Sequence, residues 1–157
     1  MRRREGLIHR VWRLPLRDIL LGLEALFLLA IARLLLVALP FAKAMRLLGL
    51  KVDAVGPQGP TEKRSAATAD GDVTLQRIRI ALRRASRLAP FRAVCLQQAV
   101  AASLMLRRRR RISEIHFGVA REQDGGMSAH AWTCSSGQVI TGMGGMTRHI
   151  PVAIFTA

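Results

Sequence analysis

Residues 95–132, CLQQAVAASLMLRRRRRISEIHFGVAREQDGGMSAHAW, change from a helical to a strand pattern. The apolar residues of the helical part, with one residue before it, recur at helical spacing: Val94, Ala101, Leu104 and Met105. This spacing predicts a helix over residues 91–111 with one buried face. In the second part, residues 112–120 alternate between apolar and polar side chains, as in a half-buried strand. The stretch therefore predicts a helix that is followed directly by a sheet.

The chain downstream of this stretch predicts more strands. Residues 129–134 (AHAWTC) and 138–142 (QVITG) form a plausible hairpin through Ser135, Ser136 and Gly137. Residues 149–155 (HIPVAIF) predict a last strand, which we expect at a sheet edge because Pro151 has no N–H to donate to a neighbour. The sheet is therefore expected to be small and antiparallel.

Upstream, residues 73–90 (VTLQRIRIALRRASRLAP) predict a helix that ends at Pro90. Its apolar stripe consists of Leu75, Ile78, Leu82, Ala85 and Leu88. A helical layer followed by an antiparallel sheet makes the expected fold class α+β, with one domain over residues 73–157. Residues 51–72 hold several prolines and glycines and are expected to be a linker.

Residues 1–50 are rich in leucine and arginine, and residues 19–39 are long and apolar enough to span a bilayer. Glu24 and Arg33 argue against a span, because each costs about 2.5–3.5 kcal/mol at the bilayer centre. We expect two shorter helices, broken near Pro40 and Phe41, that pack on the C-terminal domain or on a partner. Contact of residues 13–50 with a membrane surface and a true span are the alternatives.

The charge of the chain is strongly positive, with 25 Lys+Arg against 10 Asp+Glu and a formal net charge of +15. This excess indicates an acidic partner, an anionic membrane surface or a nucleic acid. The only cysteines are Cys95 and Cys134, without a CxxC pair, which favours the reducing cytoplasm. We therefore expect a cytoplasmic chain, with a peripheral position on the inner membrane left open.

Cys95 and His130 are the residues that indicate chemistry. Cys95 falls in the first turn of its expected helix, where the helix dipole and the nearby Arg92 stabilise a thiolate. His130 falls on a later strand, the usual relation between base and nucleophile in cysteine hydrolases. The alternatives are a cysteine packed as a small apolar residue and a structural histidine.

Several ordered features of residues 73–157 resemble the peptidase domain of lasso peptide biosynthesis B2 proteins, which are transglutaminase-like. These features are a proline shortly before "CL", a helix that ends in leucine and arginines, "FGV" and "AHAW". The resemblance implies a papain/transglutaminase-like fold, with an N-terminal helical extension, that removes the leader peptide from a lasso precursor. It implies Cys95 as nucleophile and His130 as general base and later acid, with the N–H of Cys95 as an oxyanion donor. Gln97 and Gln98 are candidates for a second donor there, and a packed or solvated glutamine is the ordinary interpretation of each.

The resemblance also implies partners: the precursor peptide, a separate leader-recognition protein of the B1 type, and a cyclase that uses ATP. No cofactor, metal or nucleic acid is expected for this chain itself. A zinc site built from Cys95, His116, His130 and Cys134 would lack short paired ligand spacing. Cys134 shares a strand face with His130 and Trp132, and we expect it to be a packed thiol.

The sequence departs from the family at the third catalytic position. Many members carry an aspartate about a dozen residues after the histidine, where this chain reads VITGMGGM. A three-residue hairpin loop places Gly142 opposite His130, whereas a two-residue loop places Met143 there and Thr141 diagonal to it. The candidate orienting groups for His130 are therefore the Thr141 hydroxyl, a backbone carbonyl, Asp124 and Glu114.

The arginine run at residues 107–111 suits the negative end of a helix dipole, so a solvated helix end is its ordinary interpretation. An anionic partner surface or precursor peptide is the alternative, and nucleic acid is disfavoured because no aromatic residues interleave the arginines. The absent acid after His130 supports a second function class, a non-catalytic basic scaffold protein in a peptide-maturation complex.

Overall fold

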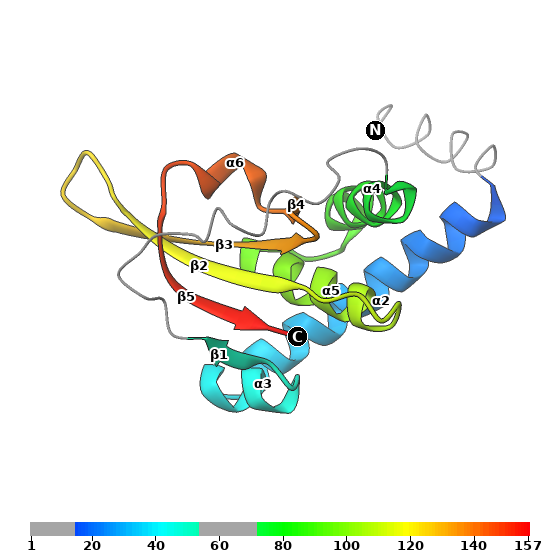
Figure 1. The fold of residues 1–157 in the computed structure, drawn as a ribbon, viewed down its shortest axis with the longest axis horizontal. Helices are drawn as coiled ribbons and strands as arrows, with labels where there is room; N and C mark the ends of the chain where they lie inside the picture. The colour runs from blue at the N-terminus through cyan, green and yellow to red at the C-terminus, as the bar shows by residue number, and fades with distance from the viewer. Residues whose placement is uncertain (1–14, 54–71) are drawn as a thin grey trace.

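A five-stranded sheet, in the order β1-β5-β2-β3-β4, forms one side of the computed structural model, which describes residues 15–53 and 72–157 (Figure 1). Neighbouring strands are all antiparallel. The elements in chain order are α2 (Leu16–Ala38), α3 (Phe41–Leu47), β1 (Lys51–Asp53), α4 (Val73–Leu88), α5 (Cys95–Arg107), β2 (Glu114–Arg121), β3 (Met127–Ser135), β4 (Gln138–Thr141), α6 (Met143–Met146) and β5 (Ile150–Thr156). The predicted α+β class is confirmed.

Helices α2, α4 and α5 pack together and form the first core cluster. Leu29 of α2, Leu75, Ile78 and Leu82 of α4, and Met105 of α5 are all 1 % exposed or less. Leu39 is extended and Pro40 follows it, so α2 ends there and α3 begins, as the sequence predicted. The N-terminal helices therefore share a core with the predicted C-terminal domain.

A second core cluster lies between the sheet and the helices α3 and α5. Ala99 and Val100 of α5 pack there with Ile115, Ala131 and Phe155 of the sheet. The expected linker at residues 51–72 begins with β1, which pairs with the end of β5, and residues 54–71 lie outside the described chain. The end of α2 and the whole of α3, over residues 35–50, therefore lead directly into the first strand of the sheet.

Strand β5 lies inside the sheet, between β1 and β2, so the expected edge position is wrong. The short β1 pairs only with Ile154, Phe155 and Thr156, and Pro151 lies beyond this contact. On the other side, Pro151 stands opposite Gly118, directly after the irregularity at Phe117 and Gly118. The proline is tolerated in an interior strand because β1 is too short to reach it.

The two faces of β3 have different neighbours. The buried Thr133 hydroxyl donates a hydrogen bond to the Ala99 carbonyl of α5 at 3.0 Å, and Ala131 belongs to the cluster beneath the sheet. Because side chains alternate along a strand, His130 and Trp132 point to the opposite face. Trp132 stacks there on His116 of β2, with ring centroids 5.4 Å apart.

The hairpin between β3 and β4 has a two-residue loop. Ser135 pairs with Gln138, and Ser136 and Gly137 both have positive φ, at 49° and 74°. Two positive φ values in succession match the twist of a tight hairpin. The register then shifts, so that Thr133 pairs with Thr141.

The arginine run at the end of α5, residues 107–111, binds groups on other elements. Arg107 donates to the Leu48 carbonyl at 2.6 Å, while Arg109 binds Glu24 of α2 and Arg111 binds Asp72, each at 2.7 Å. Asp72 also accepts from the Thr74 and Leu75 amides at the start of α4. The helix end is solvated, as expected, since Arg107 and Arg111 are exposed, but these three arginines also bind other elements.

Thr133 and Thr141 form a matched pair for measuring polar burial in the core. Both side chains are buried, but the Thr141 hydroxyl has no partner within the described residues, whereas the Thr133 hydroxyl is hydrogen-bonded. We expect Thr133→Val to lower the free energy of unfolding by about 1 kcal/mol. Thr141→Val should leave the free energy of unfolding unchanged or raise it slightly, by less than about 1 kcal/mol. Urea denaturation of both variants measures the difference, and equal losses would contradict it.

Candidate active site

Cys95 is the first residue of α5, as the sequence predicted for its first turn. Val94 occupies the N-cap position, and its aliphatic side chain cannot accept a hydrogen bond. The first amides of α5 therefore have no side-chain cap and point toward the region of the thiol. Such a terminus stabilises negative charge, both on a thiolate and on an oxyanion.

Gln97 and Gln98 hold the segment that presents Cys95. The Gln97 side-chain oxygen accepts from the Val94 amide at 3.3 Å, and the Gln98 amide donates to the Ala93 carbonyl at 2.8 Å. Both side chains are thus occupied by the backbone just before the helix. Their packed role agrees with the ordinary interpretation of these glutamines.

His130 is oriented by a backbone carbonyl. Its Nε2 lies 2.7 Å from the Gly142 oxygen, which can only accept, so Nε2 carries the proton. The other ring nitrogen, Nδ1, has no hydrogen-bond donor among the described residues. One of the orienting groups considered from the sequence, a backbone carbonyl, is therefore the group that contacts this ring.

The other three orienting candidates do not contact His130. The extra residue between the paired positions Val139 and Thr141 moves the Thr141 side chain to the Thr133 face, away from the imidazole. Asp124 accepts from the Gly126 amide in the β2–β3 turn, at 2.9 Å. Glu114 lies 3.3 Å from His116.

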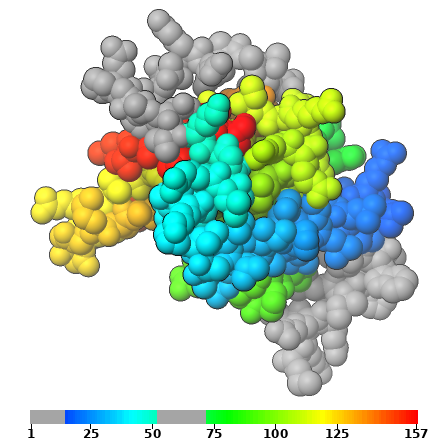
Figure 2. Space-filling view, turned by 90° about the horizontal axis from the view of Figure 1, so that it is seen from below, coloured from blue at the N-terminus to red at the C-terminus, as the bar shows by residue number. Residues whose placement is uncertain are grey.

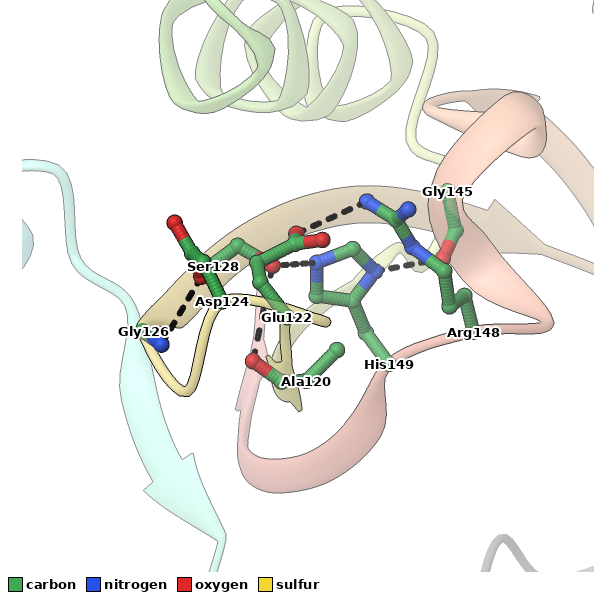
Figure 3. Close-up of polar contacts among 8 residues, drawn as sticks. All are labelled: Ala120, Glu122, Asp124, Gly126, Ser128, Gly145, Arg148 and His149. Atoms are coloured by element: carbon green, nitrogen blue, oxygen red, sulfur yellow. Dashed lines mark hydrogen bonds and ion pairs between the residues drawn. The ribbon is translucent and has the colours of Figure 1, made fainter.

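A second histidine, which the sequence did not single out, lies beside His130. The His149 ring is 5.2 Å from the His130 ring and is buried. Its Nδ1 donates to the Gly145 carbonyl at 2.7 Å, and its Nε2 accepts from the Ser128 hydroxyl at 3.1 Å (Figure 3). Strand alternation places Ser128 on the same face as His130, so the sequence could have indicated it as a neighbour. His149 comes close to His130 only through the tertiary fold.

Helix α6 covers the His130 ring closely, and glycine makes this possible. A Cβ added at Gly145 would lie 2.5–2.7 Å from the Cδ2, Cγ and Nε2 atoms of His130. Strand β4 pairs with β3 only from Thr133 onward, so the β3 edge near His130 has no neighbouring strand among the described residues. The imidazole thus sits at a free strand edge, under a short helix.

The structure does not join Cys95 to His130. Cys95 packs against the cluster beneath the sheet, whereas His130 lies on the opposite face, and no hydrogen bond connects the two side chains within the described chain. The same part of the chain contains no group of three or more His, Cys, Asp or Glu residues that could hold a metal ion. The observed arrangement therefore places the thiol and the imidazole on opposite faces of β3.

Cys134 and His116 form a packed pair of titratable groups around Glu114. Burial, and to a smaller extent the charge of Glu114, raises the pKa of the Cys134 thiol to about 11. Burial lowers the pKa of His116, against the opposing effect of Glu114. Both groups are therefore held in their neutral forms, which is the packed role expected for Cys134.

The chain belongs to the transglutaminase-like superfamily, whose sequence model matches residues 35–153 and thus most of the chain. This superfamily includes cysteine peptidases and transferases, which agrees with a helix-borne cysteine before a small antiparallel sheet. No curated protein and no solved structure matches the chain. The match covers Cys95, His130 and His149.

The raised pKa of Cys134 predicts slow alkylation. With a pKa of about 11 instead of 9.0, its thiolate is about a hundredfold less populated near neutral pH. In a Cys95→Ala variant, we expect iodoacetamide to label Cys134 slowly and about tenfold faster for each pH unit, up to about 11. The urea-unfolded variant is the control, and equal rates in the folded and unfolded chains would contradict the assignment.

Proposed function

We propose that this chain is a cysteine peptidase that removes the leader peptide from a lasso precursor, with Cys95 as its nucleophile. The observation that carries the proposal is the thiol on the uncapped first turn of α5 in a transglutaminase-like chain. The resemblance of residues 73–157 to lasso peptide biosynthesis B2 proteins supports the substrate class. The strongly basic surface of the chain supports an acidic partner or peptide.

The proposed reaction is amide hydrolysis in two steps. The Cys95 thiol attacks the carbonyl carbon at the leader–core junction, while Nδ1 of His130 takes the thiol proton. The Cys95 amide stabilises the tetrahedral oxyanion, and the imidazolium returns the proton to the leaving amine. Water then hydrolyses the thioester, with His130 again as base, and releases the carboxylic acid and the free thiol.

The Gly142 carbonyl replaces the absent aspartate in this mechanism. Its oxygen lies 2.7 Å from Nε2 and accepts the Nε2 proton, which leaves Nδ1 available as the base. A neutral carbonyl stabilises the imidazolium less than a carboxylate does, so we expect slower cleavage than with a full triad. For the first proton transfer, the thiol and the ring must come together from opposite faces of β3, which requires a conformation other than the one observed.

The partners belong to the same proposal. A separate B1-type recognition protein would bind the leader and deliver the precursor, and an ATP-using cyclase would close the ring of the released core peptide. This chain would supply the cleavage in the cytoplasm. No cofactor is needed for thiol-based amide hydrolysis.

A non-catalytic scaffold is the second candidate function. The observation that favours it is the placement of Cys95 and His130 toward opposite faces of β3. A scaffold would bind the precursor or the recognition protein through its basic surface without turnover. It predicts binding that does not depend on the thiol.

Leader release from a precursor tests the proposal. In a mixture of this chain, the recognition protein and the precursor, we expect mass spectrometry to detect the free leader. Cys95→Ala and His130→Ala should each slow its release by about a thousandfold or more, because each removes a reacting group. Cys134→Ala is the matched control and should cleave normally.

Two outcomes would overturn the catalytic assignment. Normal cleavage by Cys95→Ala would exclude this thiol as the nucleophile. Tight precursor binding by the wild-type chain, without any release of the leader, would support the scaffold instead.

A further inference from the structure

Helix α2 exposes a continuous apolar stripe. Its members follow one another at alternating intervals of four and three residues, so they line one side of the helix. All of them are exposed, and Phe27 and Val37 are 62 % and 74 % exposed. The stripe consists of Leu16, Leu20, Leu23, Phe27, Ala30, Leu34 and Val37. Figure 2 shows α2 along the surface of the molecule.

The opposite side of α2 is fixed to the rest of the fold. Ala25, Leu29 and Ala32 are completely buried against the other helices. Glu24 binds Arg109 at 2.7 Å and is also 3.4 Å from Arg108. The helix therefore cannot turn its stripe inward without losing both the core contacts and these ion pairs.

This attachment also argues against a transmembrane role. Within the described residues, α2 is the one helix that is long and apolar enough to cross a bilayer. To span, it would have to leave α4 and α5 and carry Glu24 and Arg33 into hydrocarbon, which is costly. A helix with one packed side and one exposed apolar side suits the plane of a membrane surface better.

A groove between α2 and α4 continues the stripe. It has a volume of about 210 Å³, and its walls are mostly apolar. Leu23 belongs to both the groove and the stripe, and Ile80 and Leu88 of α4 line its other wall. Arg77 and Arg84 of α4 are also among its lining residues, and both are exposed. Asp18 also lines the groove, so its charged groups are two guanidinium groups and one carboxylate. Apolar walls with this net positive charge match the chemistry of an anionic phospholipid.

The charge of the chain decides between a lipid surface and a second copy. Exposed basic residues flank the stripe at Arg17 and Arg33 and continue on α3 at Lys43 and Arg46. Two copies would each bring a formal charge of +15 to a shared apolar face and repel each other. An anionic bilayer instead attracts the same charges.

We propose that α2 docks this chain on an anionic phospholipid bilayer. The stripe enters the boundary between headgroups and acyl chains, the α2–α4 groove accepts an acyl chain, and Arg77 and Arg84 bind its phosphate. The helix lies in the membrane plane and does not cross it. This site is separate from Cys95 and His130, so it holds whether or not the chain is a peptidase.

Vesicle co-sedimentation of the full chain tests the proposal. We expect binding to vesicles of equal parts phosphatidylglycerol and phosphatidylcholine, and weak binding to phosphatidylcholine alone. Phe27→Glu with Leu34→Glu should weaken binding about tenfold or more, since it puts charge into the apolar stripe. Arg77→Glu with Arg84→Glu should reduce the preference for phosphatidylglycerol, which the other basic residues beside the stripe retain in part, and added salt should weaken the wild-type binding.

Met127→Glu is the matched control, because Met127 is 68 % exposed and lies on β3, away from α2. It should bind vesicles like the wild type, and circular dichroism should show that every variant is folded. Equal binding by the α2 variant and the control would overturn the proposal. So would a salt-resistant dimer, detected by analytical ultracentrifugation, that the α2 variant disrupts without any vesicle binding. Retention of the chain in carbonate-washed membranes would also overturn it, in favour of a span.

Discussion

The burial of helix α5 is the constraint on which the rest of the structure depends. Ala99, Ala101 and Ala102 are completely buried, so the sheet and the other helices approach the α5 backbone closely. One result is the hydrogen bond from Thr133 to the Ala99 carbonyl, which fixes the face that β3 turns toward α5. The same packing leaves the first turn of α5 at its edge, where Cys95 is half-buried and lies without a capping side chain.

The orientation of β3 has a consequence for the chemistry of the site. Because Thr133 and Ala131 face α5, the alternation of the strand sends His130 and Trp132 to the other face. The imidazole is then held by the Gly142 carbonyl and covered by α6, with His149 beside it. An acid is not needed to set the tautomer of this ring, since a backbone oxygen already does so. The thiol and the imidazole consequently lie on opposite faces of β3.

The arginines at and after the end of α5 connect this helix to α2, α3 and the start of α4. Arg109 and Arg111 bind acidic groups on α2 and at the start of α4, and Arg107 binds the end of α3. These partly exposed ion pairs contribute little energy one by one, but together with the core they fix the orientation of α2. Its apolar stripe is consequently left outside, next to a basic surface. The position of the stripe therefore follows from the same packing that buries α5.

The sequence by itself determined the local features: the α+β class, the break at Pro40, the place of Cys95 in the first turn of a helix, and the shared strand face of His130 and Cys134. These follow from hydrophobic period, proline geometry and alternation, which act between near neighbours. The expected helix over residues 91–111 is shorter in the structure, at Cys95–Arg107. Only the tertiary structure decided the interior position of β5, the bulge that turns Thr141 away from His130, and the arrival of His149. Strand order and register depend on contacts between residues far apart in the chain, and no local pattern encodes them. The placement of Cys95 and His130 on opposite faces of β3 is likewise a feature that only the tertiary structure decided.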